Sequence, residues 1–354
     1  MSVNITDVWE NYGLGEVEDK LAGIFPESGF SLEEMFAKIL SGDVLGGISY
    51  ALQSALGEVL AEISSLKDIF VWILLLGISA ALISHFIDIF DNHQIADIGF
   101  FFTYLLMSVL LLKCFRESAE VATQAMGNIV DFITAFIPAY ILSVGVASGS
   151  VTATAGYQLV LLLIYLVENV LLTLVLPLIH SYILLTMING VWAEERLTLL
   201  VEGLEKLIRF LLKVLLGLVT GLSLLQTMIT PAIDSVKTTL LHKAASAIPG
   251  IGDAADGVVE LMLGSAVLIK NSIGVVMLII LLVIALSPLV KILVLSFLLK
   301  AAAAFLGMVS DKRLTACTDK VGNGGQLLFK TVGTSVLLFL VTISIAVHTT
   351  NRGF

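Results

Sequence analysis

The sequence predicts an all-α, multi-pass membrane protein with about seven spanning helices and additional amphipathic helices at the membrane surface. Hydrophobic residues make up 58% of the 354 residues and charged residues only 14%, whereas soluble domains are about one quarter charged. Several apolar runs exceed the roughly 18 residues that mark a spanning helix. The runs are continuous, and this argues against the period-two alternation of a membrane β-barrel.

The chain divides into three expected regions. Residues 1–42 form a polar acidic head, residues 43–66 an amphipathic helix, and residues 67–354 a multi-span membrane domain. In the second region the apolar residues recur at helical spacing, from Leu45 and Ile48 to Leu66. Its polar face lacks the Lys and Arg residues of an anionic-lipid binder, so we expect it to face protein.

The expected spans are defined by the apolar runs and by the charges and turns between them. They lie at about 69–90, 98–112, 129–146, 157–191, 211–229, 273–299 and 327–347. The second ends at Lys113 and Arg116, and the fourth is longer than one membrane thickness, so Pro177 is expected to kink or split it. The amphipathic segments 43–66 and 233–268 would lie on the membrane surface or line an opening.

Charge and cysteine content exclude several classes of protein. The net charge is −10, and much of the acidic excess precedes Leu66. This distribution argues against nucleic-acid binding and against a polybasic lipid-binding segment, although the lipid bilayer itself is the expected surrounding. Cys114 and Cys317 are far apart and lack metal-ligand spacing, so neither a disulfide framework nor a metal or cofactor site is expected.

Lys291 and Pro288 are the main candidate functional residues. Lys291 follows Pro288 by three residues within the apolar run 273–299, and a lysine at the bilayer centre costs about 3 kcal/mol on insertion scales. One interpretation is a water-filled conduit or an interhelix ion pair. The other is a span that ends at Ser287-Pro288, with Lys291 reaching the interface. Lys270 and Asn271, just before the run, are interpreted as a membrane entry point.

Two glycine pairs are candidates for close helix packing. Gly145 and Gly149 have the small-xxx-small spacing that lets two membrane helices approach closely, and Gly217 and Gly221 repeat it. We expect both pairs to contribute to packing in an oligomer.

One string resembles a catalytic motif. Gly250-Ile251-Gly252-Asp253 matches the GxGD string of aspartyl intramembrane proteases, which need a second aspartate; Asp88 or Asp131 could supply it. The competing interpretation is a Pro-Gly turn whose Asp253 caps the helix that follows. Zinc-protease, serine-hydrolase and phosphate-loop motifs are missing, so no enzyme is expected.

Several sequence blocks resemble the stage III sporulation protein AE family. These are AIPGIGDAADGVVELMLGSAVLIKNSIG, SPLVKILVLSFLLKAAAAFL and, around them, GLSLLQ and TDKVGNGGQLLF. The resemblance extends from about Val71 and is sharpest over residues 221–347. Two departures are Gly250-Ile251, where the family has paired valines, and Ser287, where it has phenylalanine. Because the family block does not require GxGD, the protease interpretation loses weight.

The resemblance implies a non-enzymatic protein of the mother-cell membrane that surrounds the forespore. Family members work with the other stage III sporulation A proteins and a forespore-side partner in a channel that supports late forespore gene expression. A homo-oligomeric channel or scaffold subunit is therefore expected. The alternative is a secondary transporter with broken helices at Pro177 and Pro288 and a site near Lys291.

Overall fold

All regular structure that the computed structural model describes is helical, as the sequence predicts. The described residues are Trp9, 11–24, 31–53, 70–75, 77–79, 82, 93–148, 164–191, 196–245 and 252–349. Within them, four helices are long and apolar enough to cross a membrane: Ile98–Tyr140, Ile164–Val191, Val267–Met308 and Lys312–Val341. The fold class is confirmed, whereas the count of about seven spans is not.

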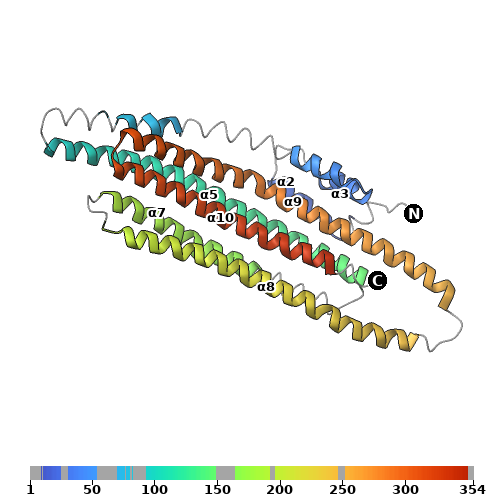
Figure 1. Ribbon diagram of the computed structural model, residues 1–354. Helices are drawn as coiled ribbons and strands as arrows, with labels where there is room; N and C mark the ends of the chain where they lie inside the picture. Colours follow the sequence, from blue (N-terminus) through green and yellow to red (C-terminus); the bar gives the residue numbers. More distant parts are fainter. Residues whose placement is uncertain are drawn as a thin grey trace.

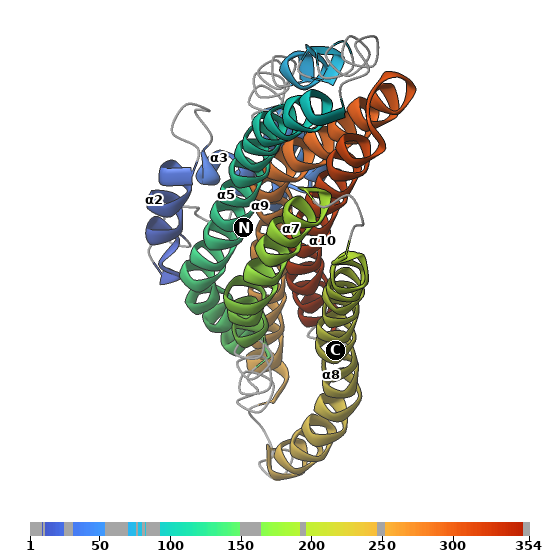
Figure 2. The ribbon, with the colours of Figure 1, turned by 90° about the vertical axis from the view of Figure 1, so that its left-hand side faces the viewer.

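Five long helices lie side by side in an elongated bundle (Figure 1). They are α5 (His93–Ser148), α7 (Leu176–Val191), α8 (Thr198–Ala245), α9 (Gly252–Val309) and α10 (Lys312–Thr349). The chain turns back after α9, so that α9 and α10 form an antiparallel hairpin. Seen along the bundle, α5, α7, α9 and α10 surround a common core, and α8 lies outside against α7 and α10 (Figure 2).

Helix α5 joins two of the expected spans into one. It contains 56 residues and continues through Lys113 and Arg116, where the sequence interpretation ended the span at 98–112 and began the next at 129–146. At ~1.5 Å per residue it is about 84 Å long. The segment between the two apolar runs has no proline and is rich in Ala and Glu, which favour helix. Arg116 also pairs with Glu120 one turn later, at 2.8 Å.

Pro177 changes the local hydrogen bonding of its helix but does not split the helix. Residues 164–170 are α-helical, Leu171–Val175 form a π-turn, and α7 follows without interruption. A proline in a helix lacks the backbone N–H and clashes with the carbonyl one turn earlier, and a π-turn relieves this by widening the helix. Within the same segment the Thr173 hydroxyl donates to the Asn169 carbonyl at 2.7 Å.

Helix α9 continues through Pro288 and Lys291. It runs for 58 residues, with Pro288 inside it, so the expectation of a helix broken at this proline is wrong. Both ends of the expected surface segment 233–268 also belong to long helices: residues 233–245 complete α8, and 252–268 begin α9. The mostly apolar sequence around Pro288 allows the helix to continue, because in an apolar surrounding no water competes for its backbone.

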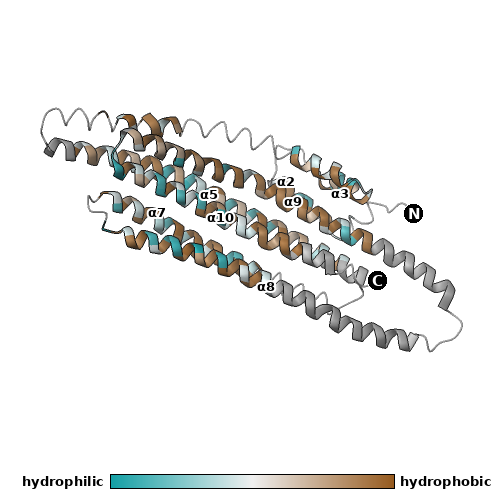
Figure 3. Cartoon of the chain, in the orientation of Figure 1, coloured by the Kyte–Doolittle hydropathy of each residue, from teal (hydrophilic) through white to brown (hydrophobic). Residues whose placement is uncertain are grey.

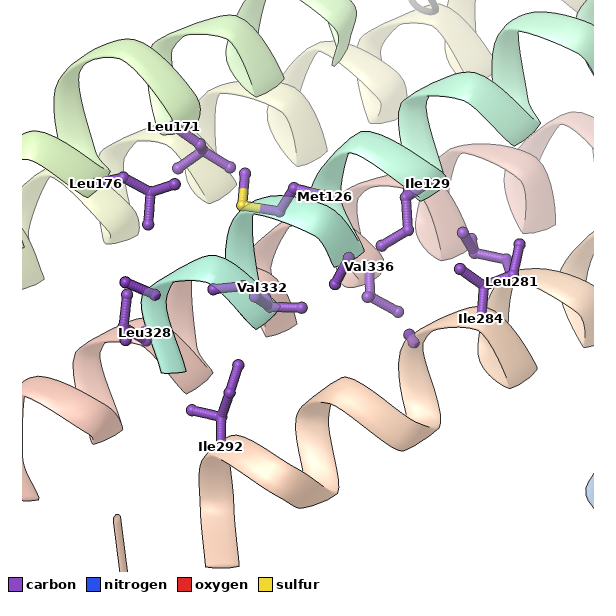
Figure 4. Close-up of a cluster of buried hydrophobic side chains, with 14 of the residues drawn as sticks. Met126, Ile129, Leu171, Leu176, Leu281, Ile284, Ile292, Leu328, Val332 and Val336 are labelled. Atoms are coloured by element: carbon purple, nitrogen blue, oxygen red, sulfur yellow. The ribbon is translucent and has the colours of Figure 1, made fainter. Parts of the chain in front are cut away.

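The core is made by aliphatic side chains from four helices. Figure 4 shows Met126 and Ile129 of α5 facing Val332 and Val336 of α10, with Leu281, Ile284 and Ile292 of α9 on one side and Leu171 and Leu176 on the other. All of these side chains are buried. Aliphatic side chains of this kind interlock at close-packed density and fix the relative positions of the helices.

The N-terminal helices pack on the outside of this bundle. Helix α2 (Leu14–Ile24) lies against α5, and α3 (Leu32–Leu40) lies against α9. Ser31 caps α3 by accepting a hydrogen bond from the Glu34 amide, and its own amide donates to the Tyr50 hydroxyl at 3.0 Å. This bond joins α3 to the helix at residues 44–53.

The helix at residues 44–53 does not pack through the leucines that predicted it. Gly47 and Ala51 are buried, whereas Leu45 is 80% exposed and Leu52 is 41% exposed. The small residues allow a close approach to Ile39 of α3. Leu45 and Leu52 therefore face outward, whereas Ile48 is partly buried against the core. Residues 54–66 lie outside the described part of the chain.

Glycines of α10 permit the close contact with α9. A Cβ on Gly325 would lie 3.0 Å from Ser296 Cβ, and a Cβ on Gly322 would lie 2.9 Å from Lys300 Cγ and 3.4 Å from the Ser296 carbonyl oxygen. The Ser296 hydroxyl donates to the Gly322 carbonyl at 2.7 Å across the same contact. Glycine at these positions therefore sets the distance between the two helices.

We predict that Gly325→Val separates α9 from α10 and destabilises the bundle by about 1–3 kcal/mol, the usual cost of overpacking. The matched control is Gly333→Val on the same helix, where a Cβ meets nothing within 4 Å. Thermal unfolding of both detergent-solubilised variants measures the difference. Equal losses of stability in the two variants would contradict the packing role of Gly325.

Candidate functional site

Polar side chains connect the long helices near the α9–α10 turn. The Lys300 ammonium of α9 pairs with the Asp319 carboxylate of α10 at 3.0 Å. The Tyr104 hydroxyl of α5 donates to the Met187 carbonyl of α7 at 2.7 Å, and it approaches Gly190 so closely that a side chain there would overlap it. These contacts join α9 to α10 and α5 to α7.

Tyr182 links three helices. It belongs to α7 and its side chain is fully buried. Its hydroxyl lies 3.2 Å from the Lys320 carbonyl oxygen of α10 and 3.5 Å from Glu205 Oε2 of α8. Glu205 is itself held by Arg209, whose Nε donates to it at 2.9 Å. A buried tyrosine with such partners positions helices, because its hydroxyl is costly to leave without a hydrogen bond.

Asn189 shapes the connection from α7 to α8. Its amide nitrogen donates to the Thr198 hydroxyl at 3.0 Å, and its amide oxygen accepts from the Leu197 backbone N–H at 2.7 Å. Asn189 is 3% exposed. One buried side chain at the end of α7 thus provides hydrogen-bond partners for polar groups at the start of α8.

Lys291 and Pro288 are both half-buried in the middle of α9. The structure places neither against Lys270 or Asn271, because 21 residues of continuous helix separate Lys270 from Lys291, or ~31 Å. The four candidates therefore do not form one site. Their separation along the helix is close to the thickness of a bilayer core.

Lys270 and Asn271 are more enclosed than an entry point requires. The Lys270 side chain is 0% exposed, and the Asn271 amide oxygen is buried without a hydrogen-bond partner. A buried lysine on a candidate membrane helix is costly and is a marker of function.

The glycine pairs differ in what the structure shows. Gly217 and Gly221 lie on the exposed side of α8, where an added Cβ meets nothing within 4 Å, so they make no close contact with the residues that the structure describes. Gly145 belongs to α5, and Gly149 lies outside the described residues. Glycines that do permit close contacts between long helices include Gly190, Gly322, Gly324 and Gly325, which spacing alone did not reveal.

The aspartates of the protease interpretation lie on different parts of the chain. Asp253 occupies the first turn of α9, and Asp131 is exposed on α5; Asp88 lies outside the described residues. In the part of the chain that the structure describes, no group of three or more His, Cys, Asp and Glu side chains could hold a metal ion.

An open hollow of about 330 Å³ lies between α5 and α7. Phe115, Arg116 and Glu120 line it from α5, and His180 and Leu184 from α7. His180 Nδ1 lies 2.9 Å from the Leu176 carbonyl oxygen; because a carbonyl only accepts, Nδ1 carries the proton. His180 packs edge-on against Phe115, the role of a helix-packing histidine.

Glu168 is the buried ionisable residue that the sequence interpretation missed. It is 1% exposed, and neither carboxyl oxygen has a hydrogen-bond partner. It lies three residues before the π-turn and next to the Ser335 hydroxyl of α10. The available signal was a single acid within the apolar run 157–191.

The outer surface of the bundle is apolar over long stretches. Figure 3 shows hydrophobic residues along α5 and α9 with polar residues between them. Phe102 is 62% exposed, Val109 68% and Phe297 70%. Apolar side chains exposed in such numbers are typical of a surface that faces lipid or another protein.

Comparison with known proteins agrees with these features. The family model of stage III sporulation protein AE matches residues 30–350. A protein described as stage III sporulation protein AE, from Bacillus subtilis (strain 168), is 21% identical over 337 residues, which are 95% of this chain and 84% of that protein. No solved structure matches the chain. The match confirms the resemblance over nearly the whole length, and the chain belongs to the stage III sporulation protein AE family.

Proposed function

We propose that this chain is a multi-pass membrane component of the channel that connects the mother cell with the forespore. It acts there as an oligomeric channel or scaffold subunit and is needed for forespore development and late forespore gene expression. The observation that carries the proposal is the family match over residues 30–350 of a chain with four apolar helices of membrane-spanning length.

Exposed apolar side chains support a membrane location. In water, large exposed residues such as Phe102, Val109 and Phe297 would be an aggregation hazard, whereas in lipid they are favourable. The helices also satisfy their backbone hydrogen bonds internally, as a membrane requires. In this proposal the membrane is that of the mother cell around the forespore.

The interhelix polar contacts support a scaffold role over catalysis. Tyr182, Asn189 and the Lys300–Asp319 pair each connect one helix to another. Such contacts hold long helices in a fixed arrangement on which other subunits can assemble. The proposed partners are further copies of this chain, the other stage III sporulation A proteins and the forespore-side channel protein.

Deletion of this chain is expected to abolish late forespore gene expression, because the channel would lack one of its membrane subunits. A forespore-specific fluorescent reporter measures the effect in the host, and the chain restored in trans is the control. An affinity-tagged copy should co-purify with the other channel proteins from sporulating cells. Normal reporter activity in the deletion strain would contradict the proposal.

The exposed glycines of α8 provide a surface for oligomer packing. We predict that Gly217→Leu combined with Gly221→Leu weakens the oligomer, since the added side chains prevent a close approach of a second helix. Gly203→Leu is the matched control, because Gly203 is also exposed on α8 with nothing within 4 Å. Mass measurement of the detergent-extracted complexes compares them. Oligomers of unchanged mass in the double variant would exclude this surface.

Lys291 is the candidate conduit residue. Lys291→Ala is expected to lower forespore reporter expression several-fold while the complex still assembles, because the conduit would lose a positive charge. Lys312→Ala, at the exposed start of α10, is the control.

The same variant separates the channel from the permease alternative. Proteoliposomes that contain this chain alone should show no solute flux that depends on Lys291 if the chain works only within the complex. Flux that Lys291→Ala abolishes would support the permease instead.

A further inference from the structure

Glu168 is enclosed by other helices as well as its own. Glu168 is 1% exposed, and Ser335 of α10, which lies beside it, is 0% exposed. The two carboxyl oxygens and the Ser335 hydroxyl oxygen all lack a hydrogen-bond partner. Three unsatisfied polar atoms are thus gathered at one place in an otherwise aliphatic core.

No ion pair neutralises Glu168 within the part of the chain that the structure describes. Lys330 lies five residues before Ser335 on α10, or ~7.5 Å along the axis. On α9, Leu281 and Ile284 lie at the level of Val336 (Figure 4). Lys291 is therefore seven residues from that level, or ~10 Å along the axis. Lys270 is eleven residues from it, or ~16 Å.

On α8, which runs back along α7 and contacts it through Tyr182 and Glu205, Lys213 lies ~9 Å short of the level of Glu168 along the axis. The last helix at this level is α5. The charged residue nearest to Ile129 on it is Asp131, which is exposed. A second carboxylate would in any case repel a negative charge on Glu168 and could not stabilise it. Among the residues that the structure describes, no neighbouring helix therefore supplies the positive charge that an ionised Glu168 would need.

A buried carboxylate without a partner is among the costliest groups a protein can contain, whereas a neutral carboxylic acid at the same place costs far less. A neutral carboxyl group also has an O–H that can donate to the Ser335 hydroxyl after a small rotation. The charge state that fits this surrounding is the protonated one.

We propose that Glu168 and Ser335 form a proton-binding site inside the helix bundle, in which Glu168 is a neutral carboxylic acid with an exchangeable proton. The π-turn at Leu171–Val175 supports exchange, because a turn with altered backbone hydrogen bonds can open more readily than regular α-helix and such turns recur at functional sites. The site does not depend on the proposed channel role.

Infrared difference spectroscopy of the full chain in lipid bilayers tests this proposal. At pH 7 the wild-type protein should show the C=O stretching band of a protonated carboxylic acid, and Glu168→Gln should lack it. The band should shift in heavy water, and above its titration midpoint its intensity should fall about tenfold for each pH unit.

Two further variants make the test specific. Asp131→Asn removes an exposed carboxyl group and should leave the band unchanged, whereas Ser335→Ala should change its frequency by removing the neighbouring hydroxyl. Circular dichroism confirms that each variant is folded. Identical wild-type and Glu168→Gln spectra, or a band that heavy water does not shift, would overturn the proposal.

Discussion

The close contact between α9 and α10 is the constraint on which the rest of the bundle depends. Gly322 and Gly325 allow the α10 backbone to approach Ser296, and the Ser296 hydroxyl bonds across the gap. Helices α5, α7 and α8 each pack against α10 in turn. Because side chains interlock at a fixed density, a shift of the hairpin would displace every helix that rests on it.

Polar groups inside this apolar bundle differ in whether they have a hydrogen-bond partner. Tyr104, Tyr182 and Asn189 are buried and have hydrogen-bond partners on another helix or on the connection that leads to it. They stabilise the arrangement because the alternative is an unsatisfied polar group in a medium without water. The carboxyl oxygens of Glu168 and the amide oxygen of Asn271 lack such partners, and structural stability gives no reason to retain them. That contrast separates the scaffold of the protein from the places where function is to be sought.

Long helices explain why several sequence-based boundaries differ from the structure. Charges at Lys113 and Arg116 suggested the end of a span, yet nothing between 113 and 128 interrupts helical hydrogen bonding, and α5 continues. Pro177 and Pro288 suggested breaks, but a proline removes only one hydrogen bond, and a π-turn or apolar surroundings let the chain continue. A charged residue or a proline adds a local free-energy cost to the helix, whereas the length of a helix depends on the elements that pack alongside it.

Composition and periodicity by themselves determined the helical class and the membrane character, because apolar content and run length are properties of the chain alone. The quoted sequence blocks likewise determined the family. Only the three-dimensional structure decided which residues meet. Lys270 and Lys291 border the same apolar run, but the continuous helix α9 places them about one membrane thickness apart. Gly217 and Gly221 face outward. It also brought Glu168 beside Ser335, 167 residues later, because helix packing joins residues whose distance in sequence carries no signal of contact.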